Sequence, residues 1–308
     1  MIDAGAVRAR NAAFWAQAAP GWITHADRQD EIGRPLGAAA LDWLRPQPGE
    51  RVLDVGCGCG GAAAELARAV APSGGVVGLD LAEAMVAAAR ARFTVPGLQF
   101  LAGDVETLDR VPGAPFDAVH SRMALMLLAD PIAGLTAIRR SLRAGGRLAA
   151  TVFRDGGVNP WLPAAMLGAA PSLGALPPLP VGDEPGPFAF ADPTRVTRLL
   201  TAAGFTDVAI GAQDVTLEAP DDPGAVAAWL IEIGPAGAAY RAAAPCAQTS
   251  ARAGAARLLD RFRTAGVGYR LPAGCWLITA TSPRPNPEKD WTGPSAAAAS
   301  AGLFPGNG

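Results

Sequence analysis

Lysine, tyrosine and histidine are scarce in this chain of 308 residues. Lys289 is the single lysine among 26 basic residues, and the chain has two tyrosines, neither of them near Lys289. The sequence therefore lacks the Tyr-x-x-x-Lys pair that many nicotinamide oxidoreductases use. Its arginines are scattered and its net charge is −2, so we expect no basic groove for nucleic acid.

Long hydrophobic runs are also missing, although half of the residues are hydrophobic. No run of about 18 uncharged apolar residues occurs, so no membrane span is expected. The first 30 residues carry Asp3, Arg8, Arg10 and Asp27, a pattern that does not fit a secretory signal. We therefore expect a cytoplasmic bacterial enzyme.

The chain has only four cysteines, Cys57, Cys59, Cys246 and Cys275. Cys57 and Cys59 are two thiols one residue apart, and no CxxC or HxxxH motif accompanies them. A metal site needs more ligands than these two, so we expect no metal.

The most informative stretch is Val52–Gly61, VLDVGCGCGG, in which a short apolar run ends in a glycine-rich loop. It predicts a buried strand, a loop whose backbone a ligand approaches closely, and a helix N-terminus. Gly56-x-Gly58-x-x-Gly61 also satisfies the general dinucleotide pattern, which is weak alone. Asp54 argues against a dinucleotide, because a carboxylate at this strand end would repel a pyrophosphate. It would instead attract a ligand with an ammonium or sulfonium group.

Three further motifs follow in order. They are GLDLAEAM, with Asp80 at the end of a strand; Gly103-Asp104-Val105 after the next strand; and Phe116–Ser121 as the fourth. Together, over residues 35 to 155, they resemble the class I S-adenosylmethionine-dependent methyltransferases, in particular the small-molecule enzymes of the UbiE-like type.

This resemblance implies an α/β fold with a Rossmann-like doubly wound sheet. The sheet should have about seven strands, mostly parallel with an antiparallel last strand, and helical cap segments should cover it. The implied cofactor is S-adenosylmethionine, which leaves as S-adenosylhomocysteine. The implied reaction is in-line transfer of its methyl group to a small-molecule acceptor.

The predicted cofactor-binding residues come from all four strand ends. Asp80 is expected to accept both ribose hydroxyls, and Asp104 to accept the adenine amino group unless it is a helix N-cap. Ser121 and Arg122 are expected at the cofactor carboxylate, although Arg122 could pair with an acid of a neighbouring helix. The full set is Asp54, Gly56, Cys57, Gly58, Gly60, Asp80, Leu81, Met85, Gly103, Asp104, Val105, Ser121 and Arg122.

The two histidines are the candidate catalytic residues. His120 ends the fourth strand, where it is either a general base or a hydrogen-bonded wall of the methionyl pocket. His25 is the weaker candidate. Met123 and Met126 are expected in the core. Asp117 is expected to be a structural acid.

Outside the central motifs the sequence predicts three further parts. Residues 1–45 form an N-terminal helical cap, with one helix over 28–44. Residues 46–282 form the methyltransferase domain, which contains a Pro-rich loop at 155–190 and a helical pair inserted at about 221–265. Residues 205–210, continuing loosely toward 217, and 275–281 are expected as its last strands, and 283–308 as a disordered tail.

Two alternatives remain open at this stage. A protein with this fold could bind S-adenosylmethionine for non-methylating chemistry or for none, and it would keep every motif above. A nicotinamide-dependent oxidoreductase is less well supported, because of Asp54 and the missing Tyr-Lys pair. The methylated atom and the oligomeric state are left open.

Overall fold

The computed structural model describes residues 4–174, 176–177, 180 and 182–284. The tail expected at 283–308 therefore falls outside the described residues from 285 onward. Within the described part, no helix is long and apolar enough to cross a membrane.

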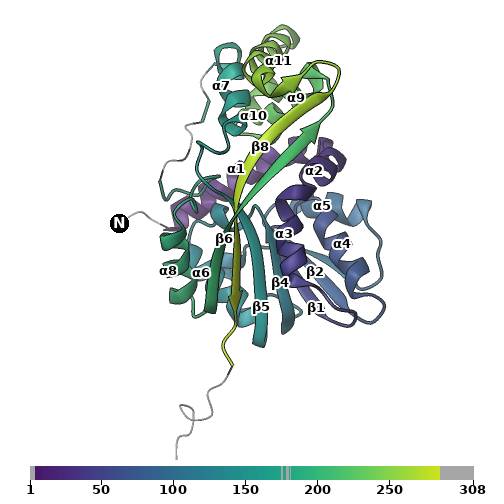
Figure 1. Ribbon diagram of the computed structural model, residues 1–308, viewed down its shortest axis with the longest axis vertical. Helices are drawn as coiled ribbons and strands as arrows, with labels where there is room; N and C mark the ends of the chain where they lie inside the picture. Colours follow the sequence, from purple (N-terminus) through teal and green to yellow (C-terminus); the bar gives the residue numbers. More distant parts are fainter. Residues whose placement is uncertain (1–3, 175, 178–179, 181, 285–308) are drawn as a thin grey trace, which may run out of the picture.

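One mixed sheet of eight strands forms the centre of the protein (Figure 1). Its order is β3-β2-β1-β4-β5-β8-β6, and the short β7 pairs with β8. Strands β1 to β5 are parallel, and β8 is antiparallel to both of its neighbours. The mostly parallel sheet with an antiparallel last strand is thus confirmed, with one short strand more than expected. The strands are β1 Arg51–Val55, β2 Gly75–Asp80, β3 Leu98–Ala102, β4 Phe116–Arg122, β5 Leu142–Phe153, β6 Thr206–Ala219, β7 Arg263–Thr264 and β8 Gly268–Thr281.

Helices cover both faces of the sheet, because the central strands bury residues on both sides. Val52 of β1 packs into one core with α3, α4 and α5, whereas its neighbour Leu53 packs into a second core with α6 and α8. This alternation makes the sheet doubly wound. The helices are α3 Arg34–Leu44, α4 Gly61–Val70, α5 Glu83–Arg92, α6 Pro131–Ser141 and α8 Pro193–Ala202.

The last two long strands extend past the rest of the sheet. β5 ends at Phe153, opposite Cys275, whereas β6 and β8 stay paired as far as Ala219 and Tyr269. β6 covers the strand expected at 205–210 and its expected continuation toward 217, whereas the strand expected at 275–281 is only the second half of the 14-residue β8. In Figure 1 this overhanging ribbon rises from the sheet and carries a second layer of helices.

That helical layer differs from the sequence prediction in two ways. The insertion expected as a helical pair contains three helices, α9 Pro223–Ile233, α10 Gly237–Ala242 and α11 Pro245–Leu259. The loop expected at 155–190 contains the helix α7 Trp161–Leu173, which packs against α11. Its Pro163 stands in the first turn, where a proline costs no hydrogen bond, and its Pro171 stands in the last turn.

Where β8 extends past β5, side chains form hydrogen bonds with its unpaired backbone groups. Asn159 is fully buried; its amide nitrogen donates to the Gly274 carbonyl at 2.9 Å, and its amide oxygen accepts from the Gly274 N–H at 3.1 Å. The Trp161 indole donates to the Pro272 carbonyl at 2.8 Å. A proline is tolerated in β8 at this point because no strand pairs with that edge.

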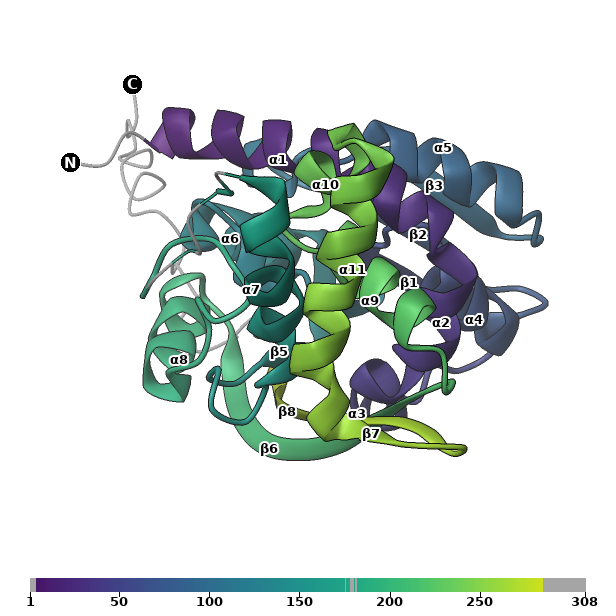
Figure 2. The ribbon, with the colours of Figure 1, turned by 90° about the horizontal axis from the view of Figure 1, so that it is seen from above.

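The N-terminal segment is helical, as expected, but it is divided into three helices. α1 Ala4–Thr24 and α2 Ala26–Ile32 precede α3, so the single helix expected over 28–44 is interrupted at Gly33. Seen from above, α1 lies along one side of the molecule between α6 and α5, beside α10 (Figure 2). It is tied to the inserted helices, since the Trp22 indole donates to the Ile233 carbonyl and Arg241 donates to the Gln17 carbonyl.

Replacing Asn159 tests how much the ribbon edge depends on one side chain. Asn159→Ala leaves the buried Gly274 N–H without its acceptor, while the Gly274 carbonyl keeps the Arg154 N–H, so the free energy of unfolding should fall by about 1–3 kcal/mol. Urea unfolding measures this. Glu218→Ala on the same ribbon removes only an exposed pair with Arg270 and should change stability by less than about 0.5 kcal/mol. Equal effects of the two changes would contradict the role of Asn159.

Candidate active site

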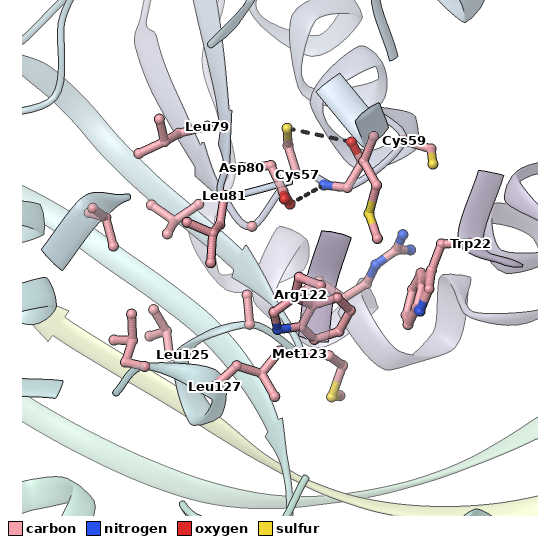
Figure 3. Close-up of a pocket in the computed structure, with 18 of the residues that line it drawn as sticks. Trp22, Cys57, Cys59, Leu79, Asp80, Leu81, Arg122, Met123, Leu125 and Leu127 are labelled. Carbon is pink, nitrogen blue, oxygen red and sulfur yellow. Dashed lines mark hydrogen bonds between the residues drawn. The ribbon is translucent and has the colours of Figure 1, made fainter. Parts of the chain in front are cut away.

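A cavity lies beyond the carboxyl ends of the parallel strands, at the point where the strand order reverses between β1 and β4. Its volume is about 180 Å³, and it is partly open to solvent. Its walls combine strand ends with residues of the N-terminal helices. Figure 3 shows Asp80, Cys57 and Cys59 on one side, Leu125 and Leu127 on the opposite side, and Trp22 beside Arg122.

The glycine loop presents backbone to this cavity. Gly56, Gly58 and Gly60 all have positive φ angles, of 73°, 52° and 91°. A Cβ on Gly58 would meet nothing within 4 Å, so the Gly58 backbone faces open space, whereas a Cβ on Gly56 would collide with Ala124. Gly58 therefore forms a cradle that a side chain would fill, as close approach of a ligand requires. Gly60 does not line the cavity; a Cβ there would lie 2.8 Å from Phe100.

Asp80 holds this loop in place from the end of β2. Its carboxylate accepts the Gly58 N–H and the Ala82 N–H, both at 2.8 Å. Burial raises the pKa of Asp80, and the two N–H donors oppose that rise. Each carboxylate oxygen keeps a second lone pair, so Asp80 can hold the loop and still accept a ligand hydroxyl.

The end of β3 contributes Gly103, Asp104 and Val105, three of the predicted cofactor-binding residues, to the cavity wall. Asp104 is also an N-cap, because its carboxylate accepts the Glu106 N–H at 2.9 Å. Glu106 was not predicted. Burial raises its pKa, and its carboxylate accepts the N–H groups of Ala129 and Asp130, so it fastens the loop before α6 to this wall.

Asp54 and His120 meet inside the sheet rather than in the cavity. They are register partners on β1 and β4, and Asp54 Oδ1 lies 2.8 Å from His120 Nδ1. Both residues are buried, and neither lines the cavity. His120 therefore neither reaches the cavity as a base nor forms part of its wall, and the Asp54 carboxylate is turned away from the place expected for it.

The remaining candidates divide between the cavity and the core. Leu81, Met85 and Arg122 line the cavity. Ser121 does not, since its hydroxyl is buried and donates to the Val55 carbonyl at 2.9 Å. His25 lies outside the lining as well: its Nε2 is 3.5 Å from Glu232, and burial lowers its pKa.

The two loop cysteines line the cavity as neutral thiols. Burial raises the pKa of Cys57 well above its usual range and that of Cys59 to about 11. Among the described residues, no group of three His, Cys, Asp or Glu side chains is arranged to hold a metal ion.

The sequence did not predict much of the cavity wall that lies opposite the strand ends. Met123, expected in the core, lines the cavity with a positive φ of 58°, a backbone strain of the kind found at functional sites. The N-terminal helical cap was expected, and its Trp15 and Trp22 line the cavity, since such side chains near a sheet edge either cap a ligand or pack. Lining residues that the sequence did not single out include Asn11, Gln29, Asp30, Leu36, Glu106, Leu125, Leu127 and Leu128.

Comparison with known proteins agrees with this geometry. The profile of the methyltransferase domain family matches residues 52–146. Nocamycin O-methyltransferase of Saccharothrix syringae is 34% identical over 200 residues, which cover 62% of this chain and 71% of that protein. Aklanonic acid methyltransferase DauC of a Streptomyces species is 38% identical over 141 residues, covering 43% and 62%.

The fold also matches solved structures. A chain of the Haloferax volcanii complex between the Trm112 methyltransferase activator and a methyltransferase aligns with a TM-score of 0.55 at 19% identity, over 88% of this chain and 98% of that one. Among the curated relatives, the share of the relative's own length that aligns runs from 39% to 71% for the first three matches.

The sheet order, the glycine loop and the acids at successive strand ends define a class I methyltransferase site. The chain belongs to the class I S-adenosylmethionine-dependent methyltransferases, and S-adenosylmethionine is its cofactor.

Asp80 provides the test of the cofactor cradle. Asp80→Ala should weaken binding of S-adenosylhomocysteine at least tenfold, about 1.4 kcal/mol, because the carboxylate no longer holds the loop or accepts the ribose. It should also lower the free energy of unfolding by about 1–3 kcal/mol, since two N–H groups lose their acceptor. Calorimetry and urea unfolding measure the two effects. Asp109→Ala, which removes an exposed pair with Arg140, is the control, and unchanged affinity in Asp80→Ala would contradict the assignment.

Proposed function

We propose that this enzyme methylates an acidic oxygen, that of a carboxylic acid or an enol, on an apolar small molecule. The single observation that carries the proposal is the composition of the cavity wall. Its uncommitted surface is apolar, and none of its described residues is a histidine or a lysine.

Several polar groups of this wall already have hydrogen-bond partners within the protein. Asn11 donates to the Leu127 carbonyl at 2.8 Å, and Gln29 accepts from the Trp229 indole at 3.0 Å. Asp104 and Glu106 accept backbone N–H groups. What is left for an acceptor is the surface of the indole rings, Met123 and several leucines, which suits a largely apolar molecule.

This wall has no histidine or lysine to remove a proton from an alcohol, and its carboxylates are held in hydrogen bonds or ion pairs. The thiols of Cys57 and Cys59 have raised pKa values, and the Arg122 guanidinium has no acceptor atom. His120 is buried against Asp54. An acceptor that is already an anion near neutral pH needs no base, so an acidic oxygen fits this wall better than an aliphatic alcohol does.

The cofactor, when bound, supplies a methyl group already activated by a sulfonium charge. The chain's own contribution is then positioning and exclusion of water. Gly58, in the glycine loop, and Asp80 form the cofactor cradle. Trp15, Trp22 and the leucines shield the cavity from solvent.

The relatives support the same acceptor class. One of the two enzymes above is named for O-methylation and the other for an acid that it methylates. We also propose that the protein works in a bacterial cytoplasm, which is supported by its four free cysteines and by the bacterial origin of these relatives.

The test compares apolar carboxylic acids and enols with the alcohols of the same skeletons. We expect methylation of the acids, and rates at least about 100-fold lower for the alcohols, because the contribution of a general base is missing. Mass spectrometry identifies the methylated atom. Production of no methylated compound, with cofactor binding intact, would favour a non-methylating protein of this fold.

The dependence of kcat/KM on pH gives a second test. The rate should rise with pH up to the pKa of the acceptor and stay level above it, since only the anionic acceptor reacts. The midpoint should therefore move when the acceptor is exchanged for one of different pKa. A fixed midpoint that disappears in His120→Asn would instead establish His120 as the base.

A further inference from the structure

Two side-chain amides line the cavity, those of Asn11 and Gln29, and they are bonded in opposite senses. Asn11 uses its amide nitrogen, which donates to the Leu127 carbonyl at 2.8 Å. Gln29 uses its amide oxygen, which accepts from the Trp229 indole N–H at 3.0 Å. The part of Gln29 that is left for a ligand is therefore its NH2 group, which can only donate.

The Trp229 indole fixes which way the Gln29 amide points. An indole N–H has no acceptor capacity, so the amide oxygen must face it and the amide nitrogen must point elsewhere. Trp229 is 2% exposed and does not line the cavity, whereas Gln29 is half-buried and lines it. Among the described residues, no group accepts a hydrogen bond from the Gln29 amide nitrogen. The NH2 group is thus an oriented donor that is available to a molecule in the cavity.

Contacts on either side of Gln29 hold its helix α2 against the inserted helix α9, which lies beside it in Figure 2. Arg28 donates to the Ala225 carbonyl at 3.0 Å, and His25, just before α2, lies 3.5 Å from Glu232. The donor therefore sits where the N-terminal helices meet the inserted helices. This is the helical wall of the cavity, and not the strand ends at which the predicted cofactor residues lie.

We propose that Gln29 selects carboxylic acids among the acidic acceptors, by donating an N–H to the carboxylate oxygen that does not react. This inference rests on the proposed function and narrows it from acidic oxygens in general to carboxylates. A carboxylate has two oxygens on one carbon, so the amide can hold one while the other stays free to react. The hydrogen bond is charge-assisted, because its acceptor is an anion. The amide itself is neutral, so it orients the acceptor without neutralising the charge that makes the reacting oxygen a nucleophile.

The transfer needs no proton from Gln29. A lone pair of the reacting oxygen forms the new bond to the methyl carbon, and the electron pair of the breaking carbon–sulfur bond stays on sulfur. The products are a methyl ester and a neutral thioether, S-adenosylhomocysteine. Gln29 contributes binding and orientation only, so its loss should raise KM for carboxylates more than it lowers kcat.

The experiment compares acidic acceptors that differ in the second oxygen. Naphthoate and decanoate have it, whereas pentafluorophenol, which also ionises near neutral pH, does not. In Gln29→Met, which keeps the length and neutrality of the side chain, KM for the two carboxylates should rise about 10- to 100-fold. KM for pentafluorophenol should change less than about threefold, since it has no second oxygen to lose a partner. Steady-state rates, with products identified by mass spectrometry, measure these effects, and calorimetry should show unchanged affinity for S-adenosylhomocysteine.

A second variant separates the donor from the packing contact. Gln29→Glu keeps an oxygen that accepts the Trp229 indole N–H but replaces the NH2 group by another oxygen. KM for the carboxylates should again rise at least about tenfold. Gln17→Met is the matched control, because Gln17 is exposed on α1 and lies outside the cavity lining, and it should behave like the wild type.

The outcomes distinguish this inference from the function on which it rests. Unchanged KM for the carboxylates in both Gln29 variants would overturn the role of Gln29 and leave methylation of acidic oxygens intact. An equal rise for carboxylates and pentafluorophenol in Gln29→Met would also overturn it, because Gln29 would then only shape the cavity. Wild-type enzyme that methylates pentafluorophenol but neither carboxylate would contradict the carboxylate selection alone. If the wild type methylates none of the three, the proposed function fails and the selection by Gln29 fails with it.

Discussion

The bonds from one carboxylate to two backbone N–H groups organise the cofactor side of this enzyme. Asp80 ends β2 and fixes both Gly58 in the loop after β1 and Ala82 before α5. The side chains of the loop are two small thiols, those of Cys57 and Cys59, and its positive φ angles belong to glycine. The cradle therefore depends on the neighbouring strand β2. This strand pairs in parallel with β1, and its register places Leu79 beside Val55.

The acceptor side depends on contacts between parts of the chain that are far apart in sequence. The N-terminal helices are bonded to the inserted helices at several points, among them Trp22 to Ile233 and Gln29 to Trp229. The inserted helices are in turn carried by the ribbon of β6 and β8, whose edge Asn159 closes. The cavity wall is thus shaped by helices whose positions are set by a strand overhang.

The distribution of charge explains what this site can do. Charged side chains gather where the cofactor is expected, at Asp80, Asp104, Asp30 and Arg122, and the opposite wall is apolar. The histidine that ends β4 is kept inside the sheet by Asp54. Such a site aligns the reactants and excludes water. It suits an acceptor that is acidic enough to be deprotonated without a base from the protein.

The sequence by itself determined the features that follow from local spacing. Asp80 and Asp104 could be placed because each follows a short apolar run, and parallel strands end at one edge. Spacing could not show that Asp54 faces His120, because that contact is set by the register of β1 with β4. Nor could it show Asp30 beside Arg122, or a β8 twice as long as expected, because both depend on contacts between segments that are far apart in the sequence. Only the tertiary structure decided which of the strand-end residues face the cavity and which face the core.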